Sequence, residues 1–363
     1  MEKKHKRIKI LYTIPNFNTA GSGKVLYDLA NGLDRELFEV HIACHHSKGF
    51  FFKEVEALGF PIHILNTTQH LRPYVTFLKR ILPFQKFIKH HQFDIVHSWH
   101  WSSDWSEVLA VRMAGAKYVY TKKAMTWGNI HWKIKSFLSH FIITINDEMH
   151  KYFPYKKNQL LIPLGIDTNY YHSNVNFDEL SKSTTFTIVT VANLVPVKGI
   201  EILIKAINHL DNNNIQLKIV GDNNTQYAQK LNDLVKSFKL EHQILFLGKH
   251  NDVRPFLVEA DLYIMPSEKE GLGMALIEAM AMGVTVLGSN VSGINYVLRD
   301  FPELLFEAGN MKQLSHAIQH WMNASAGDRK AKGAALRAYC QQHYSLEQSV
   351  KSHEELYLKL CHR

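Results

Sequence analysis

Two carboxylates eight residues apart give the strongest chemical signal in the sequence. Glu270 stands in a glycine-containing turn after an apolar strand, and Glu278 stands in the apolar helix expected over residues 274–282. A carboxylate in a helix that is apolar all round is unfavourable unless a partner satisfies it. Two ribose hydroxyls would suit Glu278, and Glu270 would then face a bound sugar. A charge at a helix N-terminus and a buried ion pair explain this segment equally well.

A lysine beside a helix start is the second signal. Lys198 follows the strand expected at residues 187–192 and precedes a helix that starts at about Ile200. A helix N-terminus presents free N–H groups and partial positive charge, so a cation next to it makes a natural diphosphate site. An exposed loop lysine is the alternative.

The glycines near the N-terminus offer a weaker phosphate loop. Gly21, Ser22 and Gly23 follow the first strand and open the first helix, but their spacing matches neither the P-loop nor the dinucleotide-binding glycine motif. We expect a backbone turn there. The sequence contains no Asp-x-Asp pair, and no His and Cys cluster has metal-ligand spacing. It therefore predicts phosphate handling with no metal and no cofactor.

Strands and helices alternate in both halves of the chain. Strands are expected at residues 8–13, 38–44, 61–65, 94–97, 117–121 and 141–145, and again at 187–192, 216–220, 244–247, 262–265 and 285–288. Helices are expected at residues 24–33, 50–58, 74–91, 328–341 and 346–360. The strands are near-continuous apolar runs, which is typical of sheets covered on both faces. The pattern predicts an α/β protein with two doubly wound parallel sheets, joined near the polar stretch 165–185.

Length and composition agree with two domains. The 363 residues fit a prior of about 150 per domain, and a 46% hydrophobic share suffices for two cores. Three widely spaced cysteines favour a reducing cytosol over a disulfide framework. No window resembles a signal peptide or a membrane span.

Positive charge is concentrated in the first half. Residues 1–165 hold 23 Lys and Arg against 12 Asp and Glu, whereas residues 166–363 hold 19 against 21. A basic surface attracts anionic lipid, nucleic acid or acidic substrates. Nothing resembles a recognition helix, an RNP-type strand or a zinc finger, so we expect no nucleic-acid partner.

Taken together, these motifs resemble the retaining glycosyltransferases of family 4, with the GT-B fold of two facing Rossmann-like domains and an interdomain cleft. The Glu270 to Glu278 segment resembles the family's Glu-seven-Glu motif. Residues 93–97 (FDIVH) resemble its Asp-hydrophobic-hydrophobic-His strand, and residues 162–167 (IPLGID) its segment leading into the second domain. The Gly221-Asp222 pair also matches in place.

The resemblance implies an acceptor-binding domain at residues 1–165, with the C-terminal helix of about 346–363 packing back on it, and a nucleotide-sugar-binding domain at 166–345. Lys198 would bind the donor diphosphate and Glu278 the ribose, while Glu270 would contact the transferred sugar. The implied donor-binding set is Gly21, Ser22, Gly23, Asn193, Lys198, Gly221, Glu270, Gly271, Leu272, Gly273, Met274 and Glu278.

Two positions depart from the family pattern. Asn193 stands where the family often has Arg, and Lys122 or Lys123 stands where it often has His. Lysine can supply positive charge there, but it is a poor acid or base near neutral pH unless its pKa is lowered. The implied catalytic set is Lys198, Glu270, Lys123 and Lys122. The three lysines would stabilise a leaving diphosphate that helps to deprotonate the acceptor.

The acceptor is expected on the first domain. His97, His100, Trp101 and Trp127 are the candidate acceptor-binding residues, most of them just after a strand end, where open α/β sheets bind ligands. Tryptophans that fill a core are an equally good explanation.

The helix expected at residues 74–91 carries Lys79, Arg80, Lys86 and Lys89 among apolar residues. A basic amphipathic helix can lie in a membrane interface, although one that packs on the sheet with a solvated basic side shows the same pattern. We expect a cytoplasmic protein that binds weakly to the inner face of an anionic membrane.

The expected reaction moves a hexose or N-acetylhexosamine from a nucleotide-sugar to a glycan or lipid-linked acceptor in polysaccharide or lipopolysaccharide biosynthesis. A UDP-sugar is the first choice of donor and GDP-mannose the second. A nucleotide-sugar epimerase and a catalytically silent GT-B scaffold are the alternatives.

Overall fold

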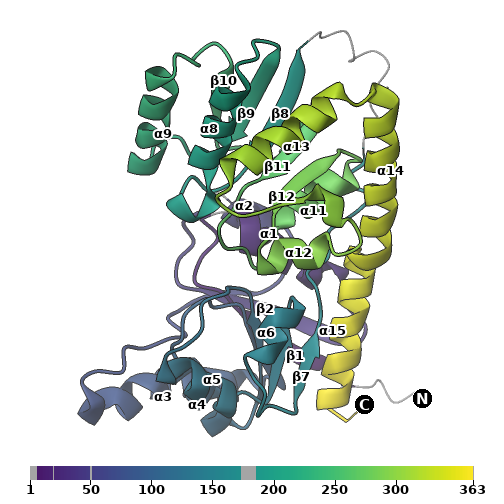
Figure 1. The fold of residues 1–363 in the computed structure, drawn as a ribbon. Helices are drawn as coiled ribbons and strands as arrows, with labels where there is room; N and C mark the ends of the chain where they lie inside the picture. The colour runs from purple at the N-terminus through teal and green to yellow at the C-terminus, as the bar shows by residue number, and fades with distance from the viewer. Residues whose placement is uncertain (1–5, 19, 50, 173–184, 363) are drawn as a thin grey trace. The chain divides into compact units, whose positions relative to one another are not determined.

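The computed structural model describes residues 6–18, 20–49, 51–172 and 185–362. The chain divides into two compact units, one made of residues 1–165 and 346–363 and the other of residues 166–345. Each unit holds a parallel sheet with helices packed on it (Figure 1). The predicted α/β class is confirmed.

The N-terminal unit contains a seven-stranded parallel sheet within the described residues, in the order β3-β2-β1-β4-β5-β6-β7. Its strands are β1 (Ile8–Thr13), β2 (Phe38–Cys44), β3 (Ile62–Ile64), β4 (Ile95–Ser98), β5 (Lys117–Lys122), β6 (Phe141–Thr144) and β7 (Gln159–Leu161). Every residue of β4 and β6 is buried, as their apolar sequences predict for a sheet covered on both faces. The strand order reverses between β1 and β4.

Helices cover this sheet. They are α1 (Ala20–Gly32), α2 (Phe52–Glu56), α3 (Tyr74–His91), α4 (Ser106–Ala114), α5 (Ile130–Leu138), α6 (Asp147–Lys151) and α15 (Leu346–Leu360). α3, α4 and α5 lie side by side (Figure 1). The apolar face of α3 recurs at helical spacing through Phe77, Ile81, Phe84 and Ile88 and joins the core.

The last helix belongs to the first unit, although the 180 residues of the second unit separate it from the rest of the first unit in sequence. α15 packs on α1, where a Cβ added at Gly32 would lie 2.7 Å from Val350 Cγ2. The hydroxyl of Tyr357 lies 3.0 Å from that of Tyr12, in the middle of the sheet. These buried contacts fix α15 to β1.

The C-terminal unit contains a six-stranded parallel sheet within the described residues, in the order β10-β9-β8-β11-β12-β13. Its strands are β8 (Phe186–Val191), β9 (Ile215–Val220), β10 (Ile244–Gly248), β11 (Leu262–Met265), β12 (Val286–Ser289) and β13 (Leu305–Phe306). The strand order reverses between β8 and β11.

The helices of this unit alternate with its strands. They are the 3-10 turn η1 (Pro196–Lys198), α8 (Ile200–Leu210), α9 (Gln226–Ser237), α10 (Arg254–Val258), α11 (Met274–Ala281), α12 (Ser292–Val297), η2 (Pro302–Leu304), α13 (Met311–Asn323) and α14 (Ala326–His343). α8 packs against α13, and α11 packs against α14 (Figure 1).

Local details differ from the sequence prediction. The first helix begins at Ala20 rather than near Lys24, so Gly21, Ser22 and Gly23 form its first turn and not a loop. The edge strands β7 and β13 were not predicted, because three-residue and two-residue strands carry no readable alternation. Phe50, the expected start of the second helix, and residues 173–184 of the expected linker lie outside the described residues.

Candidate functional site

The strand order of the C-terminal unit brings two loops together. β8 and β11 are parallel neighbours, so the loops that follow them, residues 192–199 and 266–273, leave the same edge of the sheet. Ligands of open α/β sheets bind outside the carboxyl ends of strands at such a reversal of strand order. The predicted donor residues on these two loops therefore share one location.

An ion pair joins the two loops. Lys198 Nζ lies 2.5 Å from Glu270 Oε2, with side chains 21% and 16% exposed. The backbone N–H of Glu268 also donates to the carbonyl of Val197 across 2.8 Å. The structure thus pairs two residues that sequence reasoning singled out separately.

Two glycines hold these loops in place. Gly199 has a φ of 65°, and a Cβ at this position would lie 2.1 Å from the carbonyl oxygen of Pro266. Only glycine permits this approach, which fixes Lys198 at the start of α8. Gly273, with a φ of 85°, is the N-cap of α11. Two helix starts, each with free N–H groups, therefore flank the ion pair.

Glu278 lies on α11, where it is half-buried. Burial, and then the charges of Glu278 and Glu270, raise the pKa of Tyr263 in β11. Both carboxylates are therefore close to the same phenol. The motif's eight-residue spacing places its two charges around one strand end.

The remaining predicted donor residues surround this point. Asn193 is exposed in the loop after β8, and the N–H of Gly221 after β9 donates to Gly248 across 2.9 Å. Leu272 is buried. The other members of the turn before and at the start of α11 are Gly271, Gly273 and Met274.

In the N-terminal unit, the predicted acceptor residue His97 lies in the core. Its Nδ1 lies 2.6 Å from the hydroxyl of Tyr357, and its Nε2 lies 2.6 Å from Thr121 Oγ1. The side chain is fully buried. Both ring nitrogens therefore have partners inside the unit, Nδ1 in α15 and Nε2 in the neighbouring strand β5. The expected acceptor contact at His97 does not fit this structure.

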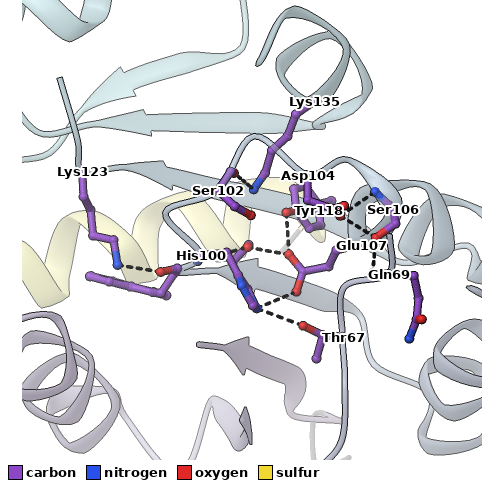
Figure 2. Close-up of polar contacts among 12 residues, drawn as sticks. Thr67, Gln69, His100, Ser102, Asp104, Ser106, Glu107, Tyr118, Lys123 and Lys135 are labelled. Atoms are coloured by element: carbon purple, nitrogen blue, oxygen red, sulfur yellow. Dashed lines mark hydrogen bonds and ion pairs between the residues drawn. The ribbon is translucent and has the colours of Figure 1, made fainter. Parts of the chain in front are cut away.

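A buried carboxylate that sequence reasoning missed lies nearby (Figure 2). Glu107 of α4 accepts hydrogen bonds from Ser98 Oγ at 2.5 Å and from the Tyr118 hydroxyl at 2.7 Å. Its other oxygen lies 3.5 Å from His100 Nε2, which in turn lies 2.9 Å from Thr67 Oγ1. In the sequence Glu107 resembles an ordinary charge in a first helical turn, so no local signal identifies it.

Opposing effects act on this cluster. Burial tends to raise the pKa of Glu107, but His100, Lys135 and Ser98 together hold it below its ordinary value. Burial lowers the pKa of His100 to about 4 despite the opposing charge of Glu107. The carboxylate is therefore charged and the imidazole neutral near pH 7.

Three lysines are held by carbonyl oxygens in the same unit. Lys122 Nζ donates to Thr126 at 2.6 Å, Lys123 Nζ to Trp99 at 2.6 Å, and Lys135 Nζ to Ser102 at 3.1 Å. In the part of the chain that the structure describes, none of them is bonded to a carboxylate. Burial, followed by repulsion from Lys135, lowers the pKa of both Lys122 and Lys123 to about 7.

The other predicted acceptor residues lie in different surroundings. Trp101 is 48% exposed, whereas Trp127 is half-buried and stacks on Tyr152 with ring centres 5.6 Å apart. His100 is buried in the Glu107 cluster. Of the predicted acceptor residues, Trp101 is the exposed one.

The predicted donor-binding residues Gly21, Ser22 and Gly23 also lie in the N-terminal unit, in the first turn of α1 after β1.

No set of three or more His, Cys, Asp or Glu residues in the described ranges is arranged to hold a metal ion. Likewise, none of the helices described is long and apolar enough to cross a bilayer.

Comparison with known families decides what kind of protein this is. Residues 19–170 match the Glycosyltransferase Family 4 domain, and residues 173–337 match the Glycosyl transferases group 1 domain. The chain belongs to the family 4 glycosyltransferases. It is an enzyme of glycosyl transfer, as the motifs around Lys198, Glu270 and Glu278 predicted.

Two relatives of this glycosyltransferase are bacterial glycosyltransferases by name. The UDP-Gal:alpha-D-GlcNAc-diphosphoundecaprenol alpha-1,3-galactosyltransferase of Escherichia coli is 23% identical, over 88% of this chain and 89% of its own length. The capsular polysaccharide biosynthesis glycosyltransferase CapH of Staphylococcus aureus is 26% identical, over 83% of this chain and 86% of its own.

Solved structures show the same fold. A glycosyltransferase from Rickettsia africae superposes with a TM-score of 0.86 at 19% identity, covering 98% of this chain and 99% of that one. Anabaena HepE in complex with UDP gives a TM-score of 0.81 at 18% identity, covering 97% and 100%. The predicted GT-B fold of this glycosyltransferase is confirmed.

Proposed function

We propose that this glycosyltransferase moves a hexose or N-acetylhexosamine from a UDP-sugar to a lipid-linked acceptor, with retention of anomeric configuration. The observation that carries the proposal is the Lys198–Glu270 pair between two helix starts at the carboxyl ends of β8 and β11. That HepE was solved with UDP, and that the E. coli relative is named for UDP-Gal and a diphosphoundecaprenol acceptor, supports the donor and the acceptor class.

The ion pair gives the donor a defined way to bind. The donor's diphosphate would take over Lys198 from Glu270, adding the N–H groups at the start of α8. Glu270, released from the lysine, would accept hydrogen bonds from the transferred sugar. Glu278 would hold the ribose hydroxyls. Lys198, Glu270 and Glu278 lie near the carboxyl ends of the neighbouring strands β8 and β11, which supports these three roles.

Catalysis would rest on stabilising the leaving group. The bond between the anomeric carbon and the UDP oxygen breaks, and the acceptor oxygen bonds to the same face of that carbon. The acceptor's hydroxyl proton passes to the departing diphosphate. Lys198 and the helix N-termini stabilise the negative charge that develops there.

Calorimetry with UDP, GDP, ADP and CMP tests the donor site directly. We expect UDP to bind the wild-type protein, and both Lys198→Met and Glu278→Ala to weaken it about tenfold or more. Lys205→Met changes an exposed lysine of α8, the helix that follows Lys198, and this matched control should bind UDP normally. UDP binding that survives both site variants would exclude this site.

Product analysis with the donor alone separates transfer from epimerisation. An epimerase converts the nucleotide-sugar without an acceptor, whereas a transferase gives only slow hydrolysis to UDP and free sugar. We expect no new nucleotide-sugar. UDP binding without transfer to any acceptor extract would instead favour a silent scaffold.

We also propose that α3 contacts an anionic membrane. Its first turns expose Tyr74, Val75 and Leu78, with Val75 94% exposed, and Lys79 is exposed next to them. Apolar side chains beside basic ones suit the interface of a bilayer. The wild-type protein should float with phosphatidylglycerol vesicles at low salt and not with phosphatidylcholine vesicles. Val75→Asp with Leu78→Asp should abolish flotation, and an unchanged result would rule out this helix.

A further inference from the structure

Two loops of the N-terminal unit are held together at the edge of its sheet. Residues 99–105 follow β4 and residues 123–129 follow β5, its parallel neighbour. Lys123 Nζ bonds the carbonyl of Trp99, and Asn129 Nδ2 donates to Ser103 Oγ across 3.4 Å. Lys135 of α5 extends to the carbonyl of Ser102 (Figure 2). These hydrogen bonds join the two loops to each other and to α5, so the loops form one surface.

An ammonium group and an open indole lie together on these loops. Lys123 Nζ is 4.9 Å from the ring centre of Trp99 and 6.0 Å from that of Trp101. Lys123 is half-buried, while nearly half of Trp101 faces solvent. An ammonium has three N–H groups. Within the described residues one of them has an acceptor, so Lys123 has two N–H groups for a ligand.

No carboxylate among the described residues is bonded to Lys123. Lys122 and Lys135 lie in the same region, and Lys135 contributes to the lowered pKa of Lys123. Asp104 Oδ1 accepts the N–H of Ser106, and Glu107 accepts two hydroxyls, so both carboxylates are engaged elsewhere. A half-buried cation without a carboxylate partner is unfavourable, and an anionic ligand would compensate its charge.

We propose that Trp101 and Lys123 form the subsite for the sugar phosphate of the acceptor, with the indole stacked on the sugar and the ammonium on the phosphate. The inference rests on the proposed function, because the proposed lipid-linked acceptor carries that phosphate. The E. coli relative is named for an acceptor of this chemistry, a sugar joined to a polyprenol through a diphosphate. The competing source of the same chemistry is the donor's own diphosphate.

Paired acceptor analogues test the subsite. The full-length protein, saturated with UDP to fill the donor site, is titrated with phenoxyundecyl-diphosphate-N-acetylglucosamine and with the phenoxyundecyl glycoside that lacks the diphosphate. The wild type should bind the diphosphate compound about tenfold more tightly or better. Lys123→Met should remove this preference, and Lys123→Arg should keep most of it. Trp101→Ala should weaken both compounds by a similar factor.

Matched controls separate the possible outcomes. Lys133→Met, an exposed lysine change on α5, should leave both affinities unchanged. A preference that persists in Lys123→Met, or a wild type without any preference, overturns the proposal. Weaker UDP binding in Lys123→Met with unchanged binding of the analogues overturns it too, and assigns the lysine to the donor.

Failure of the proposed function has a different signature. A wild type that binds no UDP contradicts the donor assignment, but titration with the two analogues still tests the subsite. The melting temperature of each variant confirms that it is folded before its affinities are compared.

Discussion

The two units hold their lysines in opposite ways. In the C-terminal unit, Lys198 is partly exposed and paired with a carboxylate, Glu270. In the N-terminal unit, Lys122 and Lys135 are buried and Lys123 is half-buried, and each donates to a carbonyl oxygen. The charge of Lys198 has an opposite charge beside it without a ligand. A buried cation without a carboxylate partner has a lowered pKa, so its charge depends on pH and on what binds.

This difference has a consequence for ligand binding. An anion that binds at Lys198 must compete with Glu270, which costs affinity but releases a carboxylate for other contacts. An anion that binds at Lys123 displaces no carboxylate and restores the ammonium's charge. The first arrangement suits a donor that must be oriented and released each cycle, and the second suits recognition of a charged acceptor.

Breaking the ion pair should have the largest effect. Lys198→Met should lower kcat/KM about 100-fold or more, because it removes the cation that stabilises the leaving diphosphate. Glu270→Gln should lower kcat as well, yet it should tighten UDP binding about twofold to fivefold, since Lys198 then has no competing carboxylate. Steady-state kinetics and calorimetry on the same samples measure both. Weaker UDP binding in Glu270→Gln would mean that the carboxylate does not compete with the ligand.

Removing the buried carboxylate of the N-terminal unit should come next. Glu107→Leu leaves the hydroxyls of Ser98 and Tyr118 without their acceptor and takes away a charge that favours protonated Lys135. We expect the free energy of unfolding to fall by about 3 kcal/mol. Urea denaturation measures this free energy. Glu107→Gln keeps one acceptor oxygen, so its stability should lie between those of the wild type and Glu107→Leu. Wild-type stability in Glu107→Leu would contradict a structural role.

Acid should destabilise the N-terminal unit through its buried histidines. Burial lowers the pKa values of His63, His100 and His353 to about 4. The unfolded chain takes up these protons near pH 6.5. The stability that the three histidines contribute is therefore full above that pH and is lost progressively as the pH falls to about 4.

Thermal unfolding between pH 7 and pH 4 measures this loss. His353→Leu should make the fall shallower, because one of the protons no longer differs between the two states. An identical pH dependence in wild type and variant would show that His353 does not contribute.

The smallest effect is expected at a buried lysine. Lys122 is fully buried, with one carbonyl bond and its ammonium 3.9 Å from the ring centre of Trp132. Lys122→Met removes the burial cost of the charge and keeps most of the volume. We expect stability to be unchanged or raised by up to about 1 kcal/mol. Urea denaturation of Lys122→Met and of Lys198→Met compares the two lysines. A loss of more than about 2 kcal/mol in Lys122→Met would show that the carbonyl hydrogen bond and ring contact of Lys122 outweigh the cost of burying its charge.

Local sequence predicted much of the fold. The apolar runs identified eleven of the strands in the described residues, because a buried parallel strand differs in composition from its flanking loops. The same runs did not identify β7 and β13, which are too short to show a pattern. The first helix was placed late because Gly21 and Gly23 resemble a turn in sequence, whereas the structure accommodates them in a helical turn.

Sequence by itself determined the α/β class and the residue types at the strand ends, including Lys198, Glu270 and Glu278, because each belongs to a local strand-loop-helix pattern. Only the tertiary structure decided which of them meet. The Lys198–Glu270 pair joins residues 72 positions apart, and Lys135 reaches Ser102 from 33 positions away. Glu107, Tyr118 and Thr67 likewise converge from separate elements. The reason is that parallel strands bring distant loops to one edge, an arrangement that no local pattern records.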